Sequence, residues 1–75
     1  MSDLWFSAML RLVILVESQG ATERARSLMV FRAPDWPVAR QRALMLGLEM
    51  ERTYIGATGQ QVRWRLEAIE TLDQL

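Results

Sequence analysis

The chain has 75 residues, of which 51% are hydrophobic, and its nine basic and nine acidic side chains give a formal net charge of zero. All nine basic residues are arginine; histidine, cysteine and lysine are absent, which excludes the usual general base, thiolate nucleophiles and Schiff-base amines. A domain of this size buries only about 60% of the surface that its unfolded chain exposes, so this much apolar sequence predicts contact with another chain.

The same composition bounds the class of protein. Zero net charge gives no overall basic field that would attract nucleic acid. Without cysteine there are no disulfides and no thiolate zinc sites, so we expect no metal and no cofactor. Asp3, not a basic residue, precedes the first apolar run, which argues against a secretory signal. The expectation is a single cytoplasmic domain over residues 1–75.

The first apolar run, Leu4–Val16, is interrupted only by Ser7 and Arg11. It is too short to cross a bilayer as a helix, which needs roughly 20 apolar residues. Its β-branched and aromatic residues favour a strand, and a run that is apolar on both alternating faces is typical of a central strand. A buried helix is the alternative that this pattern leaves open.

The two faces of this predicted strand differ. Its even residues are wholly apolar and are expected to lie under a helix: Phe6, Ala8, Leu10, Leu12, Ile14 and Val16. Its odd residues would face away from the helix: Trp5, Ser7, Met9, Arg11, Val13 and Leu15. With one helix only, nothing in the chain covers this second face, and large exposed apolar patches mark interfaces.

A polar stretch, residues 17–23, contains Gly20 and predicts the turn of an antiparallel hairpin. The second strand is predicted over residues 24–33, near a sheet edge because charge there discourages unwanted pairing. On one side it places three arginines with Leu28 and Val30. On the other side it places Ala25, Ser27, Met29 and Phe31.

Asp35 is a good N-cap, and Pro37 is tolerated in a first helical turn, so we expect a helix from about Trp36 to Arg52. One stripe of this helix is apolar and contains two alanines that allow close packing on a sheet: Trp36, Ala39, Ala43, Leu46 and Met50. Further apolar side chains fall on other sides: Val38, Met45, Leu44 and Leu48. Gly47 marks a close backbone approach or is simply tolerated.

The remaining chain predicts two strands. Residues 53–55 are a short β-prone piece, and residues 56–60 form a turn with two glycines. Residues 61–72 alternate, with Val62, Trp64, Leu66 and Ala68 on one side, until the phase slips near Ile69, which suggests a bulge. The predicted fold class is therefore α+β: a small antiparallel sheet in ββαββ order with one helix on one face.

Candidate chemistry is sparse. Glu67 and Glu70 are expected on opposite faces or separated by the bulge, so they predict no convergent carboxylate pair. Gly56 and Gly59 lack the lysine and helix of a phosphate-binding loop and indicate a turn. Three arginines on the sheet, Arg11, Arg63 and Arg65, could contact nucleic acid, although ion pairing within the sheet or across a dimer competes with this interpretation.

The residues predicted to form a protein interface share apolar character and a place outside the expected core. They are Trp5, Met9, Val13, Leu15, Met29, Phe31, Leu44 and Leu48. Together they predict a non-enzymatic interaction module, a homodimer through the helix-free sheet face or a complex with a dedicated protein partner, without a membrane.

Several motifs resemble a widespread bacterial domain-of-unknown-function family. They are Trp5-Phe6-Ser7 opening an apolar strand, Ala33-Pro34-Asp35, Tyr54, Gly59, Val62-x-Trp64 and Ile69. The chain departs from that family in its short first loop and in Trp36-Pro37 at the helix start. The resemblance implies a small stand-alone cytoplasmic protein without established activity. By analogy with other small bacterial proteins, one role to expect is neutralising a partner, as toxin immunity proteins do.

Overall fold

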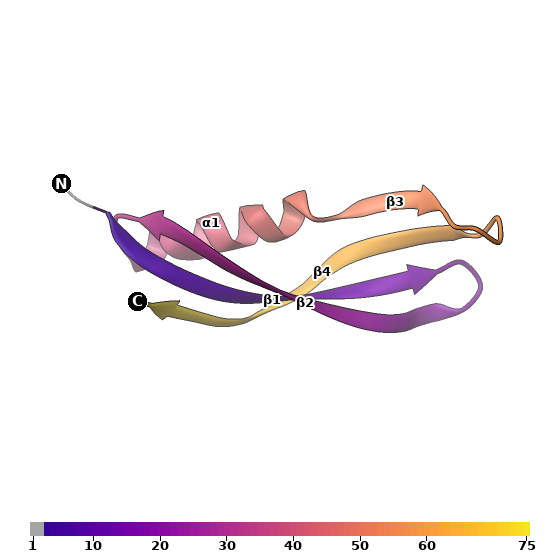
Figure 1. The fold of residues 1–75 in the computed structure, drawn as a ribbon, viewed down its shortest axis with the longest axis horizontal. Coiled ribbons are helices and arrows are strands. Elements are labelled where there is room, and N and C mark those ends of the chain that lie inside the picture. Colours follow the sequence, from indigo (N-terminus) through magenta and orange to yellow (C-terminus); the bar gives the residue numbers. More distant parts are fainter. Residues whose placement is uncertain (1–2) are drawn as a thin grey trace.

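The computed structural model describes residues 3–75. Its elements are β1 (Leu4–Val16), β2 (Gly20–Ala33), α1 (Trp36–Glu49), β3 (Arg52–Ile55) and β4 (Gln61–Gln74). The strands form one antiparallel sheet in the order β2-β1-β4-β3, and α1 packs on one face of it (Figure 1). The predicted α+β class and ββαββ order are confirmed.

β1 is the central strand, paired along its length with β2 on one edge and β4 on the other. Phe6, Ala8 and Leu10 have no exposed surface and belong to the core beneath α1. Ile14 and Val16 are only half-buried. α1 lies over one half of the long sheet, and the other half extends beyond it with β3 alongside (Figure 1). The even residues therefore share the helix side of the sheet as expected, but Ile14 and Val16 lie beyond α1, across β4 from β3, and not under the helix.

The β1–β2 hairpin is tighter than predicted. β2 begins at Gly20, so the turn is only residues 17–19. Ser18 and Gly20 both have positive φ, of 70° and 71°, a conformation that reverses the chain in few residues. One extra residue, Thr22, then shifts the register between Ile14 and Leu15, and its hydroxyl donates to the Ile14 carbonyl at 3.3 Å. This bulge allows pairing to continue to the turn, where a longer loop was expected.

α1 begins as predicted and ends early. The Asp35 carboxylate accepts from the Val38 N–H at 3.0 Å, and the Trp36 ring meets Phe6 edge-on, with centroids 5.1 Å apart. At the other end, the Met50 N–H donates to the Gly47 carbonyl in a tightened last turn. The helix ends at Glu49 and not Arg52, because Arg52 pairs with Trp64 as the first residue of β3.

The apolar stripe of α1 packs on the sheet through its small residues. Ala39, Ala43 and Gly47 are buried, which brings the helix backbone close to the strands. A Cβ atom at Gly47 would lie 2.7 Å from Leu66 Cδ2, so the glycine marks a close approach between α1 and β4.

β4 carries two register shifts against β1, one between Met9 and Leu10 and one between Arg11 and Leu12. The residues without a partner at these shifts are Glu70 and Glu67. The predicted phase slip is thus two bulges. Ala68, expected beside Leu66, pairs instead with Arg11 on the helix-free face, because the first bulge has already inverted the alternation.

Gly47→Ala should lower the free energy of unfolding by about 1 kcal/mol, because the new methyl overlaps the Leu66 side chain and displaces it from its packed position. In a Leu66→Ala background the obstacle is absent, and the same change should raise the free energy of unfolding by up to about 1 kcal/mol through better helix propensity. Urea titration of the four chains measures both effects. A stabilising Gly47→Ala in the otherwise unchanged chain would contradict the close approach.

Candidate interaction surfaces

The helix-free face carries an apolar patch at one end of the sheet. Register places Met9 of β1 beside Leu28 of β2, and Ser7 beside Val30. Trp5 is 49% exposed, Val30 55% and Leu28 61%, and Arg32 stacks over the Trp5 ring at 5.4 Å. We call Trp5, Met9, Leu28 and Val30 the sheet-face patch. None of the elements in residues 3–75 covers it.

Two predicted interface residues lie elsewhere on this face, and the two of β2 lie on the helix side, as do Leu44 and Leu48 of α1. Val13 and Leu15 are half-buried and occupy the end of β1 nearer the hairpin turn. Met29 and Phe31 pack against the core on the helix side, so their placement in an exposed interface was wrong. The exposed apolar residues of β2 are their neighbours Leu28 and Val30, because alternate strand residues point to opposite faces.

An ion-pair cluster occupies the middle of the helix-free face, between the sheet-face patch and Val13. It joins three strands and consists of Arg11, Arg24, Arg26, Glu67 and Glu70. Arg24 binds Glu67 through two hydrogen bonds, Nε to Oε1 at 2.9 Å and Nη2 to Oε2 at 3.1 Å. Arg11 Nε lies 2.8 Å from Glu67 Oε1, and Arg26 Nε lies 2.7 Å from Glu70 Oε1.

The geometry of these contacts differs. Arg11 Nε and Glu70 Oε1 are buried atoms that lack a hydrogen bond of good geometry, although each lies within ion-pair distance of an opposite charge. Charge attraction therefore holds these two contacts, whereas the Arg24–Glu67 pair is a bidentate hydrogen bond as well.

The two bulges explain how both carboxylates reach one face. Glu67 and Glu70 were expected on opposite faces or separated by the bulge, without converging. The two carboxylates do converge, because both contact Arg11. Each is the extra residue at a register shift. The signal available in the sequence was Leu66, Ile69 and Leu72, three apolar residues spaced by three in an otherwise alternating strand.

The charges around Glu67 favour its ionised form. Hydrogen bonding from Arg24 is the largest influence and lowers the pKa of the Glu67 carboxyl. Burial opposes it, and the positive charges of Arg24 and Arg11 each add a smaller lowering. The same hydrogen bond raises the pKa of the Arg24 guanidinium.

Most of the arginines predicted to contact nucleic acid are already engaged within the fold. Arg11 pairs with Glu67 and Glu70. Arg65 donates to the carbonyls of Arg52 and Trp64 and to the Thr53 hydroxyl. Among residues 3–75, only Arg63 of the three lacks such a contact. The structure does not gather these side chains into a free basic surface.

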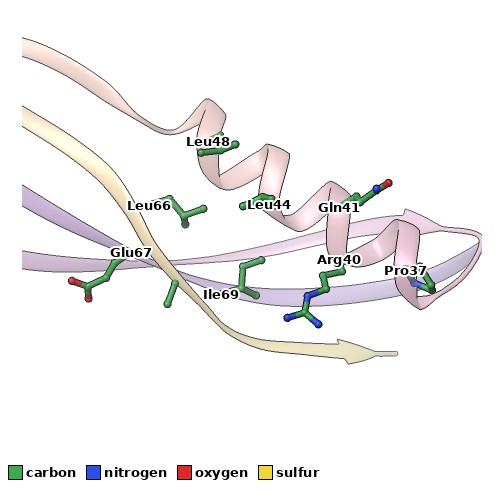
Figure 2. Close-up of a pocket in the computed structure, with 9 residues that line it drawn as sticks. Pro37, Arg40, Gln41, Leu44, Leu48, Leu66, Glu67 and Ile69 are labelled. Atoms are coloured by element: carbon green, nitrogen blue, oxygen red, sulfur yellow. The ribbon is translucent and has the colours of Figure 1, made fainter.

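A second candidate surface lies on the other side of the sheet, in a groove of about 580 Å³ between α1 and β4 (Figure 2). The predicted interface residues Leu44 and Leu48 form part of its helix wall and are 46% and 49% exposed. Its β4 wall contains Leu66 and Ile69. We call it the α1–β4 groove; Figure 2 shows Leu44 and Leu48 turned toward these β4 residues.

Residues 3–75 contain no group of three or more acidic, histidine or cysteine side chains placed to hold a metal ion. Within that part of the chain, α1 lacks the length and apolar character that a membrane-crossing helix needs.

Comparisons with protein-family models, with curated proteins and with solved structures found nothing that matches this chain. The family resemblance of its motifs therefore stays a prediction. Function is inferred from the surfaces themselves.

Because the pKa of Glu67 is lower in the folded chain, its ionised form stabilises the fold. This contribution is complete above its ordinary value of 4.5 and is lost as pH falls through the lowered value. Glu67→Gln should lower the melting temperature at pH 7 and reduce the loss of stability between pH 7 and pH values below 4.5. Glu23→Gln is the control, because Glu23 is an exposed carboxylate of β2 that forms no ion pair among the described residues. Equal pH profiles for both variants would refute the assignment.

Proposed function

We propose that the protein is a non-enzymatic interaction module that forms a homodimer through the helix-free face of its sheet. The sheet-face patch carries this proposal. Trp5, Leu28 and Val30 are each about half exposed or more, on a face that no other described element covers. Burial of apolar surface contributes roughly 25 cal/mol per Å², so covering this face is favourable.

The size of the face suits a second copy. The molecule measures 51 × 17 × 16 Å, so one sheet face has a footprint of roughly 850 Å². A standard stable interface buries about 800 Å² on each partner. Two copies related by a two-fold axis present the same patch to each other, as closed dimers do.

The ion-pair cluster is compatible with this packing. Its carboxylates, Glu67 and Glu70, are both paired with arginines of the same chain. A second sheet laid across them would therefore not leave a buried carboxylate without a partner, which is the costly outcome in a desolvated interface.

The side-chain inventory supports a role without catalysis. The chain has no histidine, cysteine or lysine, and Glu67 and Glu70 are held by arginines in the ion-pair cluster. The pairing lowers the pKa of the Glu67 carboxyl, which makes it a poor proton acceptor at neutral pH. Neutralisation of a toxin-like partner stays a prediction by analogy.

Leu28→Asp should weaken the dimer at least about 10-fold, because it places a charge in the centre of the apolar contact. Sedimentation at a series of micromolar concentrations measures the change. Met45→Asp is the matched control, since Met45 is equally exposed, at 60%, and lies on α1, on the opposite face of the sheet. An unchanged sedimentation profile in Leu28→Asp, or a wild-type chain that is monomeric throughout, would refute the proposal.

A further inference from the structure

β3 fills only part of the position beside β4. Its four residues pair with residues 61–64 of β4, and β4 continues to Gln74 without a neighbour on that side. In Figure 1, α1 runs along the same half of the sheet as this unpaired part of β4. Residues 66–74 are therefore an open strand edge, which we call the β4 edge.

The β4 edge presents backbone groups that can pair. The Leu75 N–H donates to the Trp5 carbonyl at 2.9 Å, and the Gln61 carbonyl accepts from the Glu17 N–H at 2.9 Å. The backbone groups of Leu75 and Gln61 therefore point toward the β1 side. In an antiparallel ladder, residues alternate between bonding one neighbour and the other. With the register of β4, the N–H and C=O groups of Ile69, Leu72 and Gln74 point away from β1, toward the open side.

At the end of the β4 edge nearest β3, the Glu51 side chain already binds a backbone group of the edge. Its Oε2 takes a hydrogen bond from the Leu66 N–H at 2.8 Å, in the place where a strand carbonyl would bind. No described side chain does the same for Ile69, Leu72 or Gln74. The fold thus caps the first outward N–H with a carboxylate and leaves the following ones available.

The α1–β4 groove lies directly beside this edge and has both apolar and charged walls. Leu44, Leu48 and Ile69 are apolar. Arg40 lines the groove and its extension toward Leu72, and it forms no ion pair among residues 3–75. Figure 2 shows the Arg40 side chain extending from α1 toward β4, beside Ile69.

From these features we infer that the β4 edge and the α1–β4 groove bind an extended segment of a partner protein as an added strand. The segment pairs its backbone with Ile69, Leu72 and Gln74. Every second side chain enters the groove and is apolar, and one acidic side chain binds Arg40. Backbone pairing supplies affinity, and the groove with Arg40 selects the sequence.

Charge complementarity distinguishes this occupant from a second copy. If two β4 edges paired with each other, the partner's helix-side residues would be Ile69, Leu72 and Gln74, none of which is acidic. Two nearby acids, Glu67 and Glu70, line the groove and its extension, but their carboxylates are bound by arginines of the ion-pair cluster. Asp73 lies on the helix-free face. A second copy would therefore leave Arg40 without a carboxylate.

The test uses the full chain and a displayed library of random nine-residue peptides. Selection should enrich peptides with alternating apolar residues and one acidic residue. Calorimetry with an enriched peptide should show at least about 10-fold weaker binding to Arg40→Gln, and a similar loss when a central proline replaces a pairing residue. Arg42→Gln is the matched control on the other flank of α1, where the Arg42 guanidinium donates to the Arg32 carbonyl.

Three results would overturn the inference. They are a library without enrichment, binding that Arg40→Gln does not weaken, and concentration-dependent protection of the Leu72 and Gln74 amides in the free protein, which would assign the edge to a second copy. The α1–β4 groove lies on the opposite side of the sheet from the sheet-face patch. Leu28→Asp should therefore bind the peptide as the wild type does, whatever its oligomeric state.

Discussion

The pairing of β1 on both of its edges is the constraint on which the rest of the structure depends. Because β2 and β4 satisfy its backbone, β1 can be apolar on both faces. Its even residues from Phe6 to Leu12 form the core, and two alanines and a glycine in α1 let the helix lie close above them. Its odd residues then share a surface with β2 and β4, so the same strand determines the interior and the exposed face.

The bulges of β4 connect core packing with surface charge. A regular strand would send Leu66, Ile69 and Leu72 to alternate faces, since they are spaced by three. One extra residue between each pair keeps all three on the helix side, and the two extra residues are glutamates that meet the arginines of β1 and β2. The same irregularity, occurring twice, completes the core and places two carboxylates among the arginines of the opposite face.

The sequence allowed prediction wherever one signal was local and strong. The run Leu4–Val16 predicted β1 to the residue, and Asp35 with Pro37 predicted the start of α1. The end of α1, the tight hairpin turn and the second bulge depend on partners distant in the chain, so local patterns missed them. The α1–β4 groove was also missed, although Leu44 and Leu48 were singled out, because it exists only where β3 stops pairing with β4.

The uneven cover of the sheet has a consequence for how the molecule opens. α1 covers one half of the sheet (Figure 1). Beyond it, the helix side carries a small cluster of Tyr54, Trp64 and Arg52. The Trp64 indole N–H donates to the Tyr54 hydroxyl at 3.1 Å, and the Arg52 guanidinium lies 5.1 Å from the centroid of the Trp64 ring. Fewer buried apolar contacts mean a lower free energy of local opening. Along its 51 Å axis the molecule is therefore graded in stability. The hairpin end frays first, while the helix-covered end holds the native fold until global unfolding.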